Sequence, residues 1–426
     1  MSTLRLSSPS LYSAFFAPVD DALQNIRSTR SCRSLSDREW IDCCVRRAIH
    51  QEPSGRGFLQ RIFDREDRSI ATSTYFDANA TKRRRDMLRD VGNHIGVQMR
   101  SRRRTQSDPL ADIASLADYE VFAGDGHYLA GATHDPLIDG TKRAVGHFFG
   151  LDLRTHQVFS MAVGEKGDGR KREHDMHALK RMHIDVFRQN TPRGKKVVWV
   201  WDRAGIDATQ WQKWKQTNGI YFISRTKENM RLDVIGPLEY DTSDPANRGI
   251  LSYELVTVGG QSLRLVRYQD PVKGAEYKFI TSLTTVPPGI VAVLYKARWD
   301  IEKVFDETKQ KLSEKKSWGS SVVTQLIQAE TIALTHNLMV ILEDMIEQEH
   351  GMRPVKDDLR RRLRLQAAIA TAKKHKRSLS PLLSKLWTRA TQRGLRYIRW
   401  LRNCLDRNDS LEAALARLRV TWEVSA

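Results

Sequence analysis

Two aspartates stand where predicted β-strands end. Asp125 closes the strand predicted over Tyr119–Gly124 in the segment FAGDGH, and Asp202 closes the apolar run Lys196–Trp201 in VVWVWDRAG. Ligand sites of open α/β sheets gather at the ends of the strands. An aspartate alone at such a position is also typical of a cap or a turn, so the pair indicates a binding site only if other polar residues join it.

Such residues occur on a helix that is predicted to start at Pro287-Pro288 and to run to about Leu312. At about 100° per residue, one narrow stripe of this helix holds an acid, two bases and a tyrosine, with a tryptophan beside it: Tyr295, Arg298, Glu302, Lys309 and Trp299. The apolar residues between Ala297 and Leu312 form a separate stripe that would face a core. The spacing is compatible with a functional stripe and equally with an ordinary amphipathic helix.

The predicted elements around these residues follow one another in an order that resembles the ribonuclease-H-like α/β fold. Three strands, a helix, a strand, a helix and a strand are predicted over Tyr119–Gly124, Arg143–Leu153, Gln157–Val163, His174–Gln189, Lys196–Trp201, Asp207–Gln216 and Tyr221–Ser224. Alternating β segments separated by Gly-rich turns follow at Gly249–Val258, Ser262–Tyr268 and Glu276–Ser282. We therefore expect an α/β core with a β-rich insert at about 228–286.

The charge of the chain indicates a polyanionic partner. The 426 residues carry 70 Lys plus Arg against 51 Asp plus Glu, a net charge of +19. Residues 1–110 hold 20 basic and 13 acidic side chains, residues 111–352 hold 31 and 32, and residues 353–426 hold 19 and 6. A positive excess attracts nucleic acid through counterion release and steering, although solubility alone is another interpretation. The excess lies in the two flanking regions.

The flanking regions are predicted to be helical. In residues 1–110, a cap at Ser36 starts a helix over Trp40–Ile49, and a later helix over Thr81–Val91 carries Lys82-Arg83-Arg84-Arg85. Short helices with a basic last member suit a helix-turn-helix-like DNA-binding region, and a solvated helix face is the alternative. Residues 351–426 form a basic helical region. The segment 101–108 is predicted to be a linker to the core, residues 111–350.

Composition excludes several classes of protein. Hydrophobic residues make up 40% and charged residues 28% of the chain, as in globular proteins. The four cysteines form no CxxC pair and no zinc spacing, which favours a reducing compartment. No run approaches the ~18 apolar residues that span a bilayer, and the first residues are a poor signal peptide. A cytoplasmic protein without a membrane segment is expected.

The helix stripe also resembles a known family. The spacing Y-x2-R-x3-E-x6-K is similar to the signature of bacterial insertion-sequence transposases of the insertion-sequence-four type, which belong to the DDE superfamily. Tyr295, Arg298, Glu302 and Lys309 match it completely, and Asp125 and Asp202 stand upstream at plausible distances. The resemblance covers about residues 115–345 and implies an enzyme with a ribonuclease-H-like catalytic core.

The resemblance implies roles for single residues. Asp125, Asp202 and Glu302 would be catalytic and would bind Mg²⁺, for which Mn²⁺ can substitute, since carboxylate oxygens suit hard cations. Two such ions would hold the attacking and leaving oxygens of a phosphodiester in line. DNA would contact the remaining residues of the stripe and two further bases in the segment ISRTK: Tyr295, Arg298, Trp299, Lys309, Arg225 and Lys227.

The implied function is cut-and-paste transposition of an insertion sequence, with strand cleavage and strand transfer at terminal inverted repeats. The implied partners are double-stranded DNA, as transposon ends and target, and a second copy of the chain, placing the protein on the bacterial nucleoid when bound. Two alternatives stay open: a catalytically inactive DNA-binding relic that occupies transposon ends, and a stand-alone nuclease of the same fold. The chain also departs from the family, because His127 follows Asp125-Gly126 where threonine is frequent, and no tryptophan lies between Trp214 and Trp299 to support a hairpin step.

Overall fold

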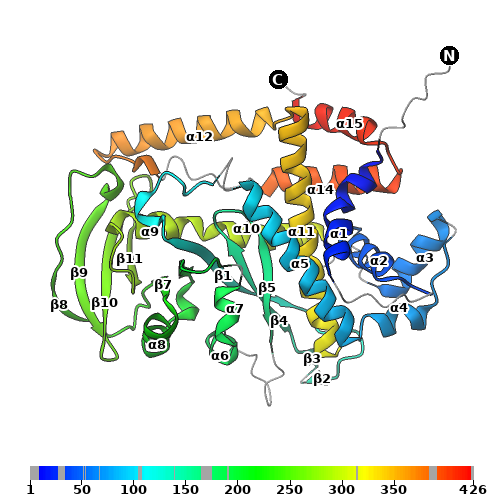
Figure 1. Cartoon of the computed structure of the whole chain (residues 1–426). Helices are drawn as coiled ribbons and strands as arrows, with labels where there is room; N and C mark the ends of the chain where they lie inside the picture. The colour runs from blue at the N-terminus through cyan, green and yellow to red at the C-terminus, as the bar shows by residue number, and fades with distance from the viewer. Residues whose placement is uncertain are drawn as a thin grey trace.

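A nine-stranded sheet extends from the left edge of the molecule to its centre (Figure 1). The computed structural model describes residues 9–26, 34–50, 52, 54–66, 68–103, 108–138, 140–164, 175–189, 191–312, 315–382 and 391–423. The strand order is β5-β4-β1-β6-β7-β11-β10-β9-β8. Within the described residues, no helix is long and apolar enough to cross a membrane.

The first five strands are those predicted upstream of the β-rich block. They are β1 (Tyr119–Leu129), β4 (Val145–Asp152), β5 (Val158–Val163), β6 (Lys196–Val200) and β7 (Ile220–Arg225). β4 is antiparallel to β1 and β5, whereas β6 is parallel to β1, and β7 is parallel to β6. β1 continues five residues beyond its predicted end, because it pairs with β4 as far as Leu129 opposite Val145.

The β-rich block extends the same sheet beyond β7. It consists of β8 (Asp233–Pro237), β9 (Ile250–Val258), β10 (Gln261–Gln269) and β11 (Glu276–Thr281). Gly259 and Gly260, with φ of 54° and 76°, close the β9–β10 hairpin in the conformation that two-residue turns favour. β8 was not predicted; it is an edge strand with Val234 and Ile235 largely exposed. A separate two-stranded sheet joins β2 (Leu137–Ile138) and β3 (Thr141–Lys142).

The two faces of the sheet carry different cores, because successive residues of a strand point to opposite sides. Phe122, Trp199 and Phe222 pack in an aromatic cluster covered by α6 (Asp175–Arg181), α7 (Ile184–Arg188) and α8 (Ala208–Asn218). The single helix predicted over 174–189 is thus two helices, and His174 lies outside the described residues. Ala123 and Val200 belong to the core of the other face, with residues of α9 (Pro288–Ala297), α10 (Trp299–Lys311) and α11 (Val322–His350).

The helix predicted from Pro287 to Leu312 is two helices, α9 (Pro288–Ala297) and α10 (Trp299–Lys311). The prediction of one continuous helix is wrong because Ile301 donates its N–H to the carbonyl of Arg298, three residues back, at 3.1 Å. This tighter turn interrupts the regular ladder at Arg298, the C-cap of α9. The stripe read from sequence is therefore bent at its arginine.

Most of the remaining helices lie beyond one end of the sheet, and α12 runs along the top of the molecule toward the other end (Figure 1). They are α1 (Leu11–Asn25), α2 (Asp37–Ile49), α3 (Gly55–Glu66), α4 (Thr72–Ala78), α5 (Lys82–Arg103), α11 (Val322–His350), α12 (Val355–Lys374), α14 (Thr391–Asp406) and α15 (Leu411–Glu423). Short 3-10 turns occur at Ala114–Leu116, Arg203–Gly205 and Pro245–Asn247. The predicted cap of α2 is confirmed as a capping box between Ser36 and Glu39.

Part of the basic run on α5 has structural partners. The Arg83 guanidinium bonds both carboxylate oxygens of Asp37 at 2.8 and 2.6 Å, and buried Arg84 donates to the carbonyl of Leu35 at 2.6 Å. α5 packs against α11 and α1. These contacts attach α5 to α2 and to Leu35, which lies just before α2. At Arg83 and Arg84, both expected roles, DNA contact and a solvated helix face, are therefore replaced by a structural one.

Candidate active site

Register places the two predicted aspartates side by side. Ala123 of β1 pairs with Val200 of β6, and Val200 pairs with Ile223 of β7, all in parallel strands. Asp125, Asp202 and Arg225 each follow these residues by two positions, so the same register brings them into one row across three adjacent strands. Alternation gives Asp125 and Arg225 the face of Ala123 and Ile223, which packs against α9 and α10, whereas Asp202 follows the end of β6. This row lies where the parallel pairing ends.

Local contacts fix the backbone at both aspartates. The Asp125 carboxylate accepts the N–H of Gly126 at 2.9 Å, and the carbonyl of Asp202 accepts the hydroxyl of Ser224 at 2.7 Å. Gly124 precedes Asp125 because a Cβ there would lie 2.2 Å from the Trp201 ring. The glycine lets Trp201 pack across β1, on the face opposite to the aspartates.

Arg298 joins Asp125 to Glu302. Its Nη2 donates to Glu302 Oε1 at 2.7 Å, and its Nη1 lies 3.7 Å from Asp125 Oδ2. The Arg298 side chain is only 4% exposed, against 34% for Glu302. Burial alone would lower the pKa of Arg298, but Tyr295, Glu302 and Asp125 together raise it. A buried, permanently charged guanidinium therefore lies between two of the three predicted acids.

Aromatic rings surround this cation. The Arg298 guanidinium lies 5.4 Å from the ring centre of Tyr295 and 5.6 Å from that of Trp299. The Tyr295 ring packs on Phe279 at 4.8 Å. Trp299 is 52% exposed, although it is one of the largest apolar side chains of the chain. An exposed indole beside carboxylates is a platform on which a base can stack.

The second acid is linked to the same cluster through Tyr295. Burial raises the pKa of the Tyr295 hydroxyl, and the Asp202 carboxylate raises it further, whereas Arg298 and Arg225 act to lower it. Asp202, Arg225 and Arg298 are therefore within electrostatic reach of one phenol. The Arg225 guanidinium lies over the ring of Tyr277 at 4.9 Å.

Lys227 and Lys309, two of the residues predicted to contact DNA, are not among the side chains that the structure shows in this cluster. Lys227 is exposed two residues past the end of β7, and among the described residues no hydrogen bond or ion pair attaches its side chain to the acids. Lys309 lies on α10, in the stretch 307–311 whose side chains are outside those described. The structure thus brings together Asp125, Asp202, Arg225, Tyr295, Arg298, Trp299 and Glu302.

The chemistry of the donors fits a hard divalent cation. Three carboxylates from β1, the end of β6 and α10 supply oxygen ligands of the kind Mg²⁺ prefers. In the described parts of the chain, no three His, Cys, Asp or Glu side chains are gathered closely enough to hold a metal ion. Instead, Arg298 neutralises Asp125 and Glu302. The residues can hold the cation only if these two carboxylates release the guanidinium.

Other polar residues near the motifs have structural roles. His127 is buried and stacks on Phe305 of α10 at 5.2 Å. Asp207 caps α8 by accepting the N–H of Gln210 at 2.9 Å, and Asp135 accepts the N–H of Ala132 at 2.7 Å in a turn. The side chain of Asp175, the remaining aspartate near the motifs, is outside those described.

One residue that positions α10 was missed by sequence reasoning. Asp300 is buried, which raises the pKa of its carboxyl to about 6, and its partners are Lys303 at 3.4 Å and His156 at 3.8 Å. His156 belongs to the turn between β4 and β5. The signal available in the sequence was an acid beside the apolar stripe of the helix, with a lysine three residues later.

Comparisons with known proteins bear on this arrangement. A family model described as "Transposase DDE domain" matches residues 120–338, from β1 to α11. No curated protein matches the chain. Among solved structures, the crystal structure of Endonuclease V from Bacillus subtilis is similar at 10% sequence identity, covering 52% of this chain and 84% of that chain with a TM-score of 0.21, too low to bear on the fold. The family model spans just over half of the chain and includes Asp125, Asp202 and Glu302; the chain therefore belongs to the transposase DDE-domain family.

Proposed function

We propose that this protein is a transposase that cleaves DNA strands at the terminal inverted repeats of an insertion sequence and joins them to a target. Membership of the transposase DDE-domain family supports the general activity. The order β5-β4-β1-β6-β7, with only β4 antiparallel to its neighbours, supports a ribonuclease-H-like core. The observation that carries the proposal is the row of Asp125 and Asp202 beside the Arg298–Glu302 pair.

In this mechanism, Asp125, Asp202 and Glu302 would hold Mg²⁺. The bound cation would supply activation of a hydroxyl nucleophile and compensation of charge at the phosphorus. Arg298 and Arg225 bind phosphate oxygens, for which the planar guanidinium is suited. Trp299 stacks on a base, and the Tyr295 hydroxyl, protonated at neutral pH, donates to a phosphate. Together these side chains would orient the scissile strand across the edge where the parallel pairing of β1 with β6 ends.

Arg298 has a second role in this proposal. Without DNA it compensates the charges of Asp125 and Glu302, which would otherwise repel each other. A phosphate entering the site competes with the carboxylates for the same guanidinium. Substrate binding and release of the carboxylates are thereby coupled, so the metal ligands become available when DNA is present.

The test is cleavage of the element's own end DNA with Mg²⁺, resolved on a denaturing gel into nicked, hairpin and joined products. Asp125→Asn, Asp202→Asn and Glu302→Gln are each expected to lower the cleavage rate by about 10²–10³-fold, while binding in EDTA is retained. Asp135→Asn, which changes a turn carboxylate, is the matched control and should cleave like the wild type. Normal cleavage by Glu302→Gln would refute the assignment.

The alternative, a DNA-binding relic without activity, is favoured by one observation, the contact of Arg298 with two of the acids. It predicts end binding without any Mg²⁺-dependent nicking in the same assay. A stand-alone nuclease would cleave without joining and without preference for the inverted repeats. We further propose a homodimer on DNA, with residues 1–110 and 351–426 flanking the catalytic core 111–350.

A further inference from the structure

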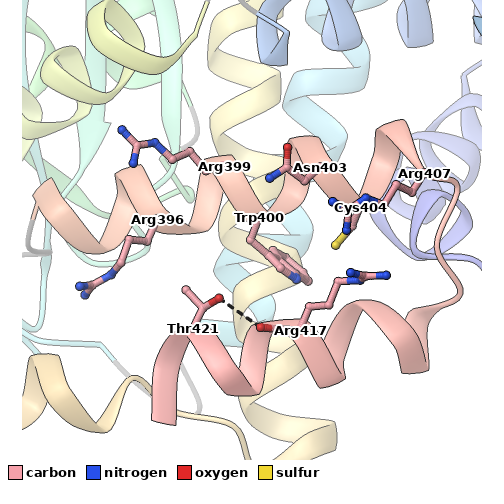
Figure 2. A pocket seen from close by; sticks show the side chains of 8 residues that line it. All are labelled: Arg396, Arg399, Trp400, Asn403, Cys404, Arg407, Arg417 and Thr421. Carbon is pink, nitrogen blue, oxygen red and sulfur yellow. Dashed lines mark hydrogen bonds between the residues drawn. The ribbon is translucent and has the colours of Figure 1, made fainter. Parts of the chain in front are cut away.

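A basic cleft lies between α14 and α15, away from the carboxylates of the sheet. Figure 2 shows its lining, which encloses a cavity of about 330 Å³. Four arginines line it, Arg396 and Arg399 from α14, Arg407 from the turn directly after α14, and Arg417 from α15, together with the polar side chains of Asn403 and Thr421. None of these residues belongs to the proposed catalytic site.

The cleft is a preformed part of the fold. The indole N–H of Trp400 donates to the carbonyl of Ala414 at 2.8 Å and so ties α14 to α15. Tyr397 packs against Trp400 at 5.2 Å and stacks on Trp422 of α15 at 6.1 Å. All three rings are buried. The two helices therefore hold their arginines at fixed positions without a ligand.

Positive charge in the cleft is only partly compensated. Arg417 pairs with Asp409 at 3.1 Å. In the part of the chain that the structure describes, no carboxylate lies within ion-pair distance of Arg399 or Arg407. The floor adds no negative charge, because burial, reinforced by Asp409, raises the pKa of the Cys404 thiol to about 12. The guanidinium groups of Arg399 and Arg407 can therefore bind an anion without first breaking an ion pair within the described residues.

The opposite side of α14 is attached to the rest of the molecule. Arg402 donates to the carbonyl of Ile49 at 2.8 Å, and Asp406 pairs with Arg65 of α3 at 2.7 Å. α14 also packs against α10, the helix that carries Glu302. The cleft is therefore a rigid extension of the framework that holds the proposed catalytic residues.

The spacing of the arginines fits a polymer of phosphates. Arg396 and Arg407 are eleven residues apart, about 16 Å along the helix axis. One strand of B-DNA presents a phosphate every ~3.4 Å of its axis, so this length matches about five phosphates. A single small anion would reach only one or two of these guanidinium groups. The uncharged amide of Asn403 suits a backbone contact that carries no sequence preference, whereas the Thr421 hydroxyl donates to the carbonyl of Arg417 at 3.1 Å.

We propose that the α14–α15 cleft binds the phosphodiester backbone of DNA, as an anchor separate from the catalytic carboxylates. The proposal rests on the proposed function only in taking DNA as the polyanion. It requires neither cleavage nor a metal.

The experiment measures binding of the full chain to a 30-base-pair duplex of unrelated sequence in EDTA, as a function of salt concentration. Each phosphate contact contributes about 0.9 to the slope of log K against log salt. The double variant Arg399→Gln/Arg407→Gln should therefore lower the magnitude of the slope by about 1.8. The matched control, Arg193→Gln/Lys213→Gln, removes two exposed charges from the turn before β6 and from α8 and should leave the slope unchanged. Equal thermal unfolding of both variants would show that folding is intact.

Two results would overturn the proposal. One is a slope that the cleft variant and the control change equally, or that neither changes. The other concerns inorganic pyrophosphate, the probe for a small-anion site: micromolar binding that the cleft variant loses, with the DNA slope unaltered, would identify the cleft as a site for free anions. The binding assay contains EDTA and therefore no free metal ion. Failure of the proposed catalytic function would thus not change either result.

Discussion

The contact between Arg298 and Glu302 can be measured as a coupling free energy with a double-mutant cycle. Arg298→Gln, Glu302→Gln and the double variant together isolate the pair from the other effects of each substitution. The hydrogen bond is short, 2.7 Å, and its donor is almost fully buried. These features place the pair above an ordinary surface salt bridge, which contributes about 0.2–1 kcal/mol.

The expected magnitude follows from the exposure of the two partners. A hydrogen bond to a charged group contributes about 1.5–3 kcal/mol to stability. Because Glu302 is 34% exposed, solvent screens its charge, and we expect a coupling of about 1–2 kcal/mol. Arg298→Gln alone should cost more than Glu302→Gln alone, since it leaves Asp125 as well as Glu302 without their shared counter-charge.

The assay is urea unfolding in EDTA, followed by the fluorescence of the ten tryptophans. The control cycle uses Arg267 and Glu276, which form a bond of the same length, 2.7 Å, between side chains that are 39% and 35% exposed. We expect a coupling of about 0.5 kcal/mol or less for this pair. If the cycle at Arg298 and Glu302 gave no more than the control, the guanidinium would not be held between the acids, and its proposed competition with phosphate would have no basis.

Two further perturbations test the framework around the site. Ser36→Ala removes the cap that accepts the N–H of Glu39, so it should cost about 1 kcal/mol, measured as a fall in the free energy of unfolding; an unchanged value would mean that the capping box contributes nothing. Burial raises the pKa of the Glu330 carboxyl from 4.5 to about 8, so the folded state favours its protonated form, and stability should decrease as pH rises from about 4.5 to 8. A shift of one pKa unit corresponds to about 1.4 kcal/mol, but the Glu330 side chain is only partly buried, so we expect the free energy of unfolding to fall by about 2 kcal/mol. Glu330→Gln should abolish this fall. An equally steep pH dependence in that variant would contradict the assignment.

The strands that carry the aspartates could be predicted because their signals are local. Lys196–Trp201 is a continuous apolar run, and such runs mark strands buried on both faces. An aspartate directly after such a run lies at the strand end whatever the rest of the fold does. The pairing of β1 with β6, which brings Asp125 beside Asp202, was expected only from the order of elements and from the family resemblance.

Other features could not be predicted, because they depend on contacts between distant segments. The break at Arg298 reflects a single hydrogen bond from Ile301, in a segment whose composition suits a continuous helix. β8 is exposed on both sides and has no apolar alternation to identify it. The engagement of Arg83 by Asp37 depends on how α5 packs on α2. Charge runs and helix periodicity do not contain this information.

The attachment of the first described residues to the last helices has a consequence for synthesis. Leu11 donates its N–H to the carbonyl of Asp409, and Leu411 donates to Pro9, at 3.1 and 2.9 Å. Ribosomes add about 5–20 residues per second, so α1 emerges some 20–80 s before the segment that receives it. During that interval the strands with Asp125 and Asp202 can already pair, whereas the α14–α15 cleft does not yet exist. A nascent chain therefore acquires its sheet before its second proposed contact with DNA, and only the finished molecule combines the two.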